Sequence, residues 1–205
     1  MKVSILDYDA GNLASVYNAF HNFGASVKII SNYKEISSAE RLVVPGVGSA
    51  KNCIDHLIKK NFFSELCHFI KKDRPILGIC LGFQIFGNNL FENGKSKGLG
   101  LIDADVKEIS KVNDILITHV GWNKISYNQK IMKKFSFKNE EAYFYFCHSF
   151  KMIINNDSKL ECSDTIYKKQ QIPALVLKDN FIGTQFHPEK SQVAGSKIIE
   201  KFLTF

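Results

Sequence analysis

Long apolar runs are absent from this sequence of 205 residues. The runs Leu42–Gly46 and Ile76–Leu81 are far shorter than the roughly 18 residues that a membrane-spanning helix needs. The opening residues, MKVSILDYDAGNL, also lack the basic segment, the long apolar stretch and the small-residue cleavage site of a secretory signal peptide. We therefore expect a cytoplasmic protein that does not enter a membrane.

Cysteine is sparse, and its pattern forms no motif. The five cysteines lie far apart and include no C-x-x-C pair: Cys53, Cys67, Cys80, Cys147 and Cys162. An odd number at wide spacing argues against a disulfide framework and against a structural zinc site. We expect most of these cysteines to be small buried apolar residues, and we predict no metal and no cofactor.

Acidic residues are fewer than basic ones, 20 against 27, so the formal net charge is +7. Such an excess can indicate a nucleic-acid partner. Here, however, the lysines occur as scattered pairs with no aromatic residues between them: Lys59-Lys60, Lys71-Lys72, Lys133-Lys134 and Lys168-Lys169. Scattered pairs are typical of solvated surface, so we expect no nucleic-acid binding.

The first half of the chain alternates short buried strands with amphipathic helices. The predicted strands are Val3–Asp7, Ser26–Ile30, Leu42–Val44 and Pro75–Ile79, and the predicted helices are Gly11–Phe23, Ala50–Ile70 with a break near Asn61, and Leu81–Phe91. Strands that alternate with helices pair in parallel through right-handed crossovers, with helices on both faces of the sheet. This pattern predicts a doubly wound α/β fold, whose ligands bind at the carboxyl ends of the strands.

The second half is rich in β-branched and aromatic residues separated by polar turns. The predicted strand segments are Gly98–Ser110, Ile115–Ser126, Ala142–Ile154, Leu160–Tyr167, Pro173–Lys178 and Phe181–Phe186. A last helix over Ser191–Leu203 closes the chain, with Ser191 as its N-cap. No linker rich in Gly, Ser or Pro divides the sequence. We expect one domain over residues 1–205, with a mostly parallel sheet, flanking helices and an additional antiparallel β section.

The most informative segment is Pro75–Gln84, in which a buried strand runs into Cys80. Gly78 and Gly82 lie two residues to either side of this cysteine. The spacing is the cysteine counterpart of the G-x-S-x-G elbow, in which the nucleophile occupies a tight turn between strand and helix. A helix N-terminus there favours the thiolate form. An isolated cysteine would be better interpreted as a buried strand residue, but both glycines and the strand–helix context favour a nucleophile.

A nucleophilic cysteine needs a base, and the base needs an orienting group. His187 and Glu189 offer both, because residues i and i+2 of an extended segment project to the same side. Pro188 between them stiffens the link. Alone, this motif would be weak, because a surface histidine beside a surface glutamate is common. With the elbow it predicts a Cys–His–Glu relay, provided that the segments meet in space.

The segment Val44–Gly48 follows the third predicted strand and carries two glycines. An oxyanion hole could form from the amide of Leu81, directly after the nucleophile, and from that of Gly46 or Val47. The alternative for Val44–Gly48 is an ordinary turn at the end of a strand.

Together these motifs resemble those of the class I, or triad, glutamine amidotransferases. The resemblance is carried by GICLGFQ, PGVG and QFHPEKS and spans nearly the whole chain. Within that family the sequence resembles the glutaminase subunits of imidazole glycerol phosphate synthases, because DYDAGNLASV, HVGWN, YFCHSF and HPEKSQ follow in the expected order. Asp9, Phe83, Thr118 and Val120 depart from the residues usual in that group.

The resemblance implies a γ-glutamyl thioester on Cys80 and a class I glutamine amidotransferase-like fold. It further implies that Gln84 and Glu92 bind the substrate glutamine. Four residues match regions that face a partner and regulate the glutaminase: Trp122, Asn123, Tyr145 and Lys190. Trp122 could equally belong to the core. His119 and His148 are interpreted as structural.

The resemblance also implies a partner. This would be a (β/α)8-barrel cyclase that forms a heterodimer with the chain and uses its ammonia to make imidazole glycerol phosphate and aminoimidazole carboxamide ribotide in histidine biosynthesis. Two alternatives stay open: a paralogous glutaminase that supplies an acetamidino-sugar synthase in surface glycan biosynthesis, and a catalytically silent binding subunit.

Overall fold

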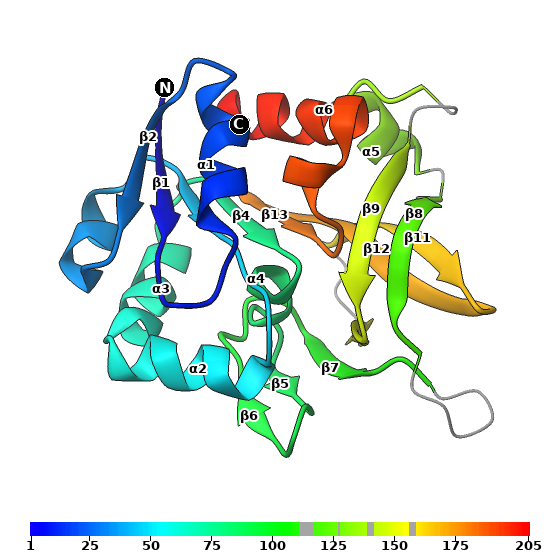
Figure 1. The fold of residues 1–205 in the computed structure, drawn as a ribbon, viewed down its shortest axis with the longest axis horizontal. Helices are drawn as coiled ribbons and strands as arrows, with labels where there is room; N and C mark the ends of the chain where they lie inside the picture. The colour runs from blue at the N-terminus through cyan, green and yellow to red at the C-terminus, as the bar shows by residue number, and fades with distance from the viewer. Residues whose placement is uncertain (111–116, 127, 139–141, 156–158) are drawn as a thin grey trace.

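The computed structural model describes residues 1–110, 117–126, 128–138, 142–155 and 159–205 (Figure 1). Its main sheet has seven strands in the order β11-β12-β13-β4-β3-β1-β2. The parallel strands are β1 (Lys2–Leu6), β2 (Ser26–Ile30), β3 (Leu42–Val44), β4 (Ile76–Ile79) and β13 (Phe181–Thr184). The antiparallel strands β12 (Gln170–Lys178) and β11 (Glu161–Tyr167) extend the sheet beyond β13.

Helices cover both faces of this sheet, as the alternating sequence pattern predicted. The helices α1 (Leu13–His21) and α6 (Gln192–Leu203) pack on one face, and α2 (Ala50–Lys59) and α3 (Phe62–Ile70) pack on the other (Figure 1). Successive residues of a strand point to opposite faces. Val43 accordingly packs in the core beneath α1 and α6, whereas Leu42 and Val44 pack against α2 and α3.

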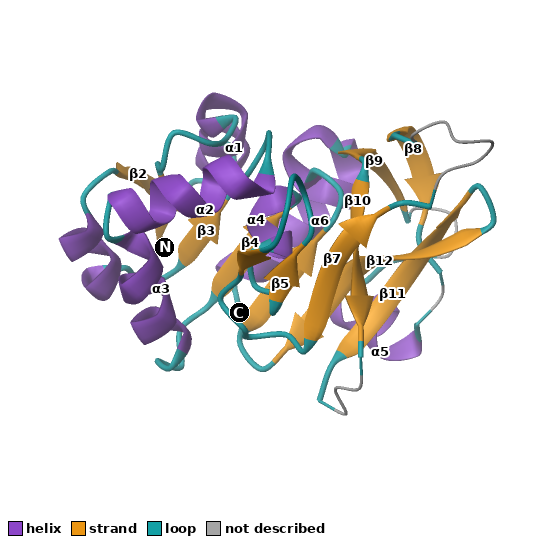
Figure 2. Ribbon diagram, turned by 90° about the horizontal axis from the view of Figure 1, so that it is seen from below, coloured by secondary structure: helices purple, strands orange, loops and turns teal. Residues whose placement is uncertain are grey.

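The predicted antiparallel β section is also present, at one end of the molecule (Figure 2). A four-stranded sheet contains β10 (Phe150–Ile154), β7 (Ala104–Glu108), β5 (Asn89–Leu90) and β6 (Ser96–Lys97). A two-stranded ribbon pairs β8 (His119–Lys124) with β9 (Tyr143–His148). The short helix α5 (Gln129–Lys134) lies between the two strands of the ribbon in sequence.

Three predicted strand segments were too long. Of Gly98–Ser110 only Ala104–Glu108 is a strand, and Ala142–Ile154 divides into β9 and β10, which belong to different sheets. The segment Ile115–Ser126 begins outside the described residues and contains β8. An apolar, β-branched composition does not indicate where a strand leaves one sheet for another.

The prediction of a helix over Leu81–Phe91 was wrong beyond its first turn. The helix α4 ends at Gln84, and Asn89–Leu90 is a strand. A longer helix needs the carbonyl groups of residues 85–88 for its own hydrogen bonds. Those carbonyls instead accept from Leu99, Ile102, Gly100 and Gly98, respectively, so tertiary pairing replaces the helix.

The break predicted near Asn61 is confirmed. Asn61 has a φ of 58° and separates α2 from α3. The sequence pattern missed the 3-10 helices η1 (Tyr33–Ser38) and η2 (Pro188–Lys190), the strand β6 and the helix α5. Within the described part of the chain, no helix is both long and apolar enough to cross a membrane.

Candidate active site

Three neighbouring parallel strands end at the same edge of the main sheet. β3 pairs with β4, with Val44 opposite Gly78, and β4 pairs with β13, with Ile79 opposite Thr184. The segments that follow these strands carry the predicted oxyanion residues, the predicted nucleophile and the predicted base. The strand order therefore brings together segments separated by more than a hundred residues, at the edge where α/β folds bind ligands.

Cys80 occupies the tight turn between β4 and α4. Its φ and ψ are 54° and −111°, a backbone conformation that residues other than glycine rarely adopt. Its amide donates to the carbonyl of Thr184 at 2.7 Å, and the carbonyl of Cys80 accepts from Phe83 at 3.0 Å. The side chain is 6% exposed and lies directly before the first turn of α4.

The glycines around Cys80 are required by close backbone contacts. A Cβ atom at Gly78 would lie 2.8 Å from the carbonyl oxygen of Gly82, and a Cβ atom at Gly82 would overlap the carbonyl oxygen of Val44. The two glycines therefore let the elbow fold back on itself and pack against the end of β3. This is the physical reason for the spacing noted in the sequence.

His187 and Glu189 lie together, and both side chains are buried. The distance from His187 Nδ1 to Glu189 Oε1 is 2.8 Å, with 5% and 2% of the two side chains exposed. The link between them is not extended as expected, because Pro188–Lys190 forms the 3-10 helix η2. The contact forms all the same, because the tight turn returns the carboxylate to the ring.

The protonation of His187 depends on two opposing effects. Burial alone lowers its pKa, but hydrogen bonds and charge interactions with Cys80 and Glu189 raise it, to about 10. Because Nδ1 contacts Glu189, Nε2 is the ring nitrogen left for the sulfur of Cys80. The geometry therefore provides a sulfur, an imidazole and a carboxylate in sequence.

Ser191 holds the histidine segment in place and does not act as predicted. It stands at the N-cap position of α6, but its side chain makes no capping hydrogen bond. Its hydroxyl instead donates to the carbonyl of His187 at 2.6 Å and accepts from the amide of Tyr145 at 3.0 Å. The amide of His187 in turn donates to the carbonyl of Tyr145 at 2.9 Å, so β9 anchors the turn.

The predicted oxyanion residues lie beside the elbow. The Cα of Gly46 packs so closely on the peptide between Leu81 and Gly82 that a Cβ atom would overlap the nitrogen of Gly82. Val47 and Leu81 line the cavity that contains Cys80, and Gly48 follows with a φ of 95°. The structure thus brings the end of β3 against the start of α4.

The cavity at this edge has a volume of about 420 Å³. Cys80, His187 and both predicted substrate residues line it. Gln84 is buried, and its Nε2 donates to the carbonyl of Phe150 at 2.9 Å and to Gln185 Oε1 at 2.8 Å. Glu92 accepts a hydrogen bond from the amide of Ala50, and so caps the start of α2, where Ser49 makes no side-chain cap.

Sequence reasoning missed Gln185 and the carbonyl of Cys147. Gln185 is fully buried, and its Nε2 lies 3.7 Å from the sulfur of Cys80. The carbonyl oxygen of Cys147 lies 3.8 Å from the same sulfur. The position of Gln185, two residues before His187, was the only local signal for it.

Three of the four predicted partner residues form a partly exposed group next to the cavity. Trp122 is 49% exposed, and its ring lies 6.2 Å from that of Tyr145. The ammonium group of Lys190 lies 5.8 Å from the centre of the Tyr145 ring, and Lys190 also lines the cavity. Asn123 is set apart from these three, because its amide donates to the carbonyl of Ile166 at 3.0 Å.

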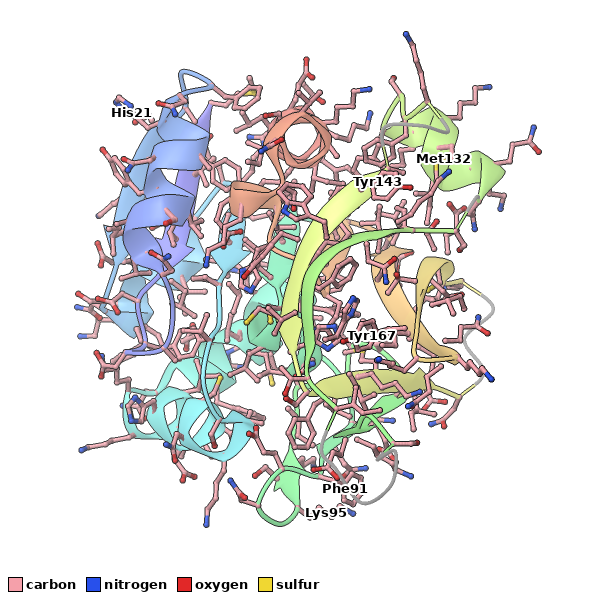
Figure 3. All side chains as sticks on the ribbon, turned by 45° about the vertical axis from the view of Figure 1, so that its right-hand side comes forward. His21, Phe91, Lys95, Met132, Tyr143 and Tyr167 are labelled. Carbon is pink, nitrogen blue, oxygen red and sulfur yellow. The ribbon has the colours of Figure 1, made fainter. Side chains whose placement is uncertain are left out.

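His119 and His148 are packed into the interior. His119 Nδ1 lies 3.1 Å from His148 Nε2, and the His119 ring stacks between Phe146 and Tyr167. Of these residues, Tyr167 is labelled in Figure 3. Burial lowers the pKa of His119 to about 4 and that of His148 to about 3. Both rings therefore remain neutral at ordinary pH, and His148 lines the cavity that contains Cys80.

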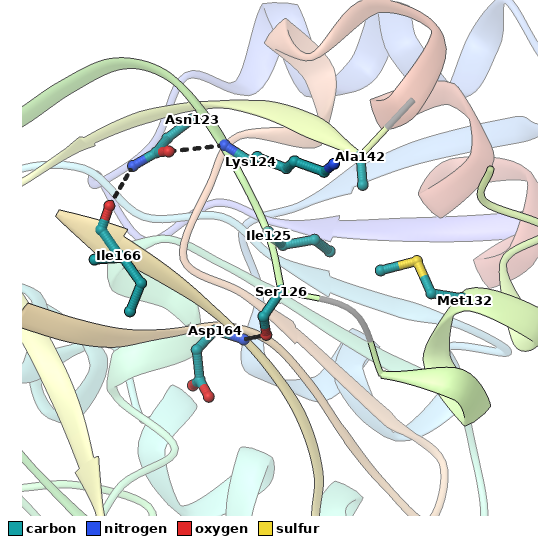
Figure 4. A pocket seen from close by; sticks show the side chains of 8 residues that line it. All are labelled: Asn123, Lys124, Ile125, Ser126, Met132, Ala142, Asp164 and Ile166. Carbon is teal, nitrogen blue, oxygen red and sulfur yellow. Dashed lines mark hydrogen bonds between the residues drawn. The ribbon is translucent and has the colours of Figure 1, made fainter. Parts of the chain in front are cut away.

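A second cavity, of about 470 Å³, lies where β8, α5 and β11 meet (Figure 4). Among the predicted residues only Asn123 lines it, and its lining contains no cysteine or histidine. The second cavity therefore lacks the groups for nucleophilic chemistry that the first one has. Among the described residues, no group of three or more His, Cys, Asp or Glu side chains could hold a metal ion.

Comparison with known proteins identifies relatives over the whole chain. The family model "Glutamine amidotransferase class-I" matches residues 4–204. The imidazole glycerol phosphate synthase subunit HisH 1 of Legionella pneumophila (strain Lens) is 40% identical, with 98% of each chain covered. The corresponding HisH subunit of Caldanaerobacter subterraneus is also 40% identical, with 98% of this chain and 96% of the relative covered.

Two further comparisons extend this result. The chloroplastic imidazole glycerol phosphate synthase hisHF of Arabidopsis thaliana is 35% identical, and the match covers 98% of this chain but 34% of that protein. Among solved structures, PurLQS from Thermotoga maritima matches with a TM-score of 0.74 at 18% identity, covering 99% of this chain and 97% of that chain. At this identity, the structural match shows the fold alone.

Proposed function

This chain belongs to the class-I glutamine amidotransferase family, whose reaction is the hydrolysis of glutamine, and we propose that it carries out this reaction through Cys80, His187 and Glu189. The observation that carries the proposal is that Cys80, directly before the first turn of α4, lines one cavity with His187, whose Nδ1 contacts the buried carboxylate of Glu189 and whose pKa is raised by its interaction with Cys80. This arrangement has the geometry of a nucleophile, a base and an orienting group.

The reaction proceeds through a covalent thioester. The thiolate of Cys80 attacks the side-chain amide carbon of glutamine, and a tetrahedral intermediate with a negatively charged oxygen forms. The intermediate collapses as His187 donates its proton to the leaving nitrogen, which departs as ammonia. Water then attacks the thioester while His187 accepts a proton, and glutamate leaves as the thiolate is restored.

Backbone amides stabilise the oxyanion in this scheme. Leu81 and one of Gly46 or Val47 supply the N–H groups, which lie on the two segments that pack against each other beside Cys80. Gln84 and Glu92 bind the substrate. The negatively charged carboxylate of Glu92 pairs with the ammonium group of glutamine. Gln84 lines the cavity, and its hydrogen bonds to Phe150 and Gln185 hold its side chain in place.

The ammonia is used by a partner protein. Several relatives are named as subunits of imidazole glycerol phosphate synthase, and the Arabidopsis relative is about three times as long as the matched region. Ammonia released into solvent would be diluted and protonated, so a docked synthase is the physical expectation. The partner is a (β/α)8-barrel cyclase of histidine biosynthesis, which forms a cytoplasmic heterodimer through the face that carries Trp122, Tyr145 and Lys190, while Asn123 lies on the opposite side of β8.

Measurement of glutamate release tests the proposal. The protein is assayed alone, then with a candidate cyclase and its nucleotide ligand, as the parent sequence, as Cys80→Ala and as Cys67→Ala. We expect the cyclase to stimulate hydrolysis, and Cys80→Ala to lower it by at least roughly a thousandfold. Cys67 lies on α3, away from the cavity, so Cys67→Ala serves as the matched control and should retain activity.

Two results would contradict the proposal. Hydrolysis that survives in Cys80→Ala would exclude the assigned nucleophile. Stimulation only by a sugar amidotransferase system, and not by the cyclase, would exclude the assigned partner while leaving the glutaminase reaction in place.

A further inference from the structure

Tyr8 is a buried polar residue that the proposed chemistry does not use. It follows β1, the strand that lies next to β3 in the main sheet, and its side chain is fully buried. Its hydroxyl group donates a hydrogen bond to the carbonyl oxygen of Pro45, which is 37 residues away in sequence. Tyr8 therefore reaches across the sheet edge to the segment that carries the proposed oxyanion amides.

The surroundings of Tyr8 keep its hydroxyl in the donating form. Burial raises the pKa of Tyr8 well above its ordinary value, and nearby Cys53 raises it further. The hydroxyl therefore keeps its one proton and directs it to the carbonyl oxygen of Pro45. The contact with Pro45 is therefore a stable donor–acceptor bond.

A fixed carbonyl at Pro45 also fixes the next amide. The carbonyl of one residue and the N–H of the next lie in one rigid plane and point in opposite directions. The bond from Tyr8 therefore sets the direction of the N–H of Gly46. Neighbouring atoms also restrict the backbone of Gly46. A Cβ atom there would lie 2.8 Å from the hydroxyl oxygen of Tyr8 and would overlap the nitrogen of Gly82.

The contrast with the next residue shows where the restraint ends. Val47 is 43% exposed, and Gly48 follows it with a φ of 95° and open space around its Cα. The restraint by Tyr8 thus acts on the buried start of the segment, at the point where it enters the cavity.

We propose that Tyr8 is a positioning residue for the glutaminase reaction, which holds the peptide between Pro45 and Gly46 so that the N–H of Gly46 faces the developing oxyanion. The inference rests on the proposed glutaminase function. Tyr8 touches neither substrate nor nucleophile, and it acts only through the peptide between Pro45 and Gly46.

The test compares Tyr8→Phe with Thr165→Val. Tyr8→Phe removes the hydroxyl and keeps the ring. Thr165→Val removes another buried hydroxyl that donates to a backbone carbonyl, that of Lys124 at 2.9 Å, away from the cavity. For each variant, kcat and KM for glutamine are measured with and without the cyclase, together with the rate of Cys80 alkylation by iodoacetamide, a reaction that forms no oxyanion.

For Tyr8→Phe we expect kcat to fall about tenfold or more, because loss of one oxyanion donor costs about 10²- to 10³-fold and misplacement costs part of that. KM and the alkylation rate should stay within about twofold. Thr165→Val should leave kcat, KM and the alkylation rate unchanged, even if it lowers the unfolding temperature.

Either of two outcomes for Tyr8→Phe would overturn the inference: an unchanged kcat, or an equal loss in kcat and alkylation rate, which would indicate general disruption of the site. Unfolding temperatures of both variants separate a folding defect from a positioning defect. If the parent protein shows no Cys80-dependent hydrolysis, the proposed function fails and this inference fails with it.

Discussion

His187 lies between two groups that both favour its protonated form. Burial disfavours the charged ring, yet the bonds to Cys80 and Glu189 outweigh that effect and raise its pKa to about 10. Under the proposed mechanism, the proton needed by the leaving ammonia is already on the ring when glutamine binds. Cys80 raises the pKa of His187 most, and Glu189 raises it next; the carboxylate of Glu189 lies 2.8 Å from Nδ1.

Glu189→Gln should lower the pKa of His187, because the substitution removes the carboxylate charge and its bond. A raised pKa in the folded state stabilises the protein fully below the unfolded value of about 6.5, and this contribution is lost as the pH rises toward 10. The parent protein should therefore exceed the variant in unfolding free energy most near pH 6 and least near pH 10. NMR titration of the His187 ring and chemical denaturation at several pH values measure the two effects.

Glu200→Gln is the matched control for this prediction. Glu200 is an exposed residue of α6, so its substitution should leave the His187 titration unchanged. A His187 midpoint that is the same in Glu189→Gln as in the parent would show that the carboxylate does not set the charge of the ring.

At the scale of single elements, the sequence predicted those whose signals are local. The strands of the parallel core and the break at Asn61 follow from apolar spacing and from a residue that tolerates a φ of 58°. The helix beyond Gln84 could not be excluded from sequence, because the carbonyls of residues 85–88 are taken by residues 98–102. The division of β9 from β10 likewise depends on which sheet each strand joins.

The candidate site shows the same division between local and tertiary signals. Cys80 and its two glycines form a pattern that a reader of the sequence can recognise. Gln185 carries no such pattern, and its contact with the sulfur exists only because β13 pairs with β4. The role inferred for Tyr8 likewise depends on β1 and β3 being neighbours in the sheet.

The tight packing of the elbow on β3 gives a prediction at the element scale. Gly82→Ala should destabilise the protein by about 1–3 kcal/mol, because the new Cβ overlaps the carbonyl oxygen of Val44 and neither backbone segment can yield easily. For a chain of this size, each kcal/mol lowers the unfolding temperature by about 2–4 °C. Thermal unfolding followed by circular dichroism measures the loss.

Gly24→Ala provides the comparison, because Gly24 has a φ of 73° but no atom near its Cα on the side where a Cβ would stand. Gly24→Ala should lower the free energy of unfolding by about 1 kcal/mol, which is the strain of the left-handed conformation alone. If Gly82→Ala were no more destabilising than Gly24→Ala, the close approach of the elbow to β3 would not be a constraint on the fold.

At the scale of the whole molecule, the outer side of the β8–β9 ribbon differs from the rest of the site region. Val120, Trp122 and Tyr143 are each about half exposed there, at 54%, 49% and 49%. Val120 and Trp122 lie two residues apart on β8, so their side chains project to the same side of the ribbon. Large exposed apolar residues next to a reactive cavity are typical of a surface that another protein covers.

Trp122 is the only tryptophan of the chain, so it reports directly on that surface. If the proposed cyclase docks there, its binding should shift the Trp122 fluorescence to shorter wavelength, because the indole leaves water. A cyclase without tryptophan, or a difference spectrum, isolates the signal.

Trp122→Ala should weaken binding of the cyclase by roughly tenfold or more, since buried aromatic anchors carry much of the binding free energy of an interface. Ile29→Ala is the control, because Ile29 is 42% exposed on β2, at the opposite end of the main sheet from β11 (Figure 1). Equal affinities for both variants, measured by calorimetry, would place the partner elsewhere on the molecule.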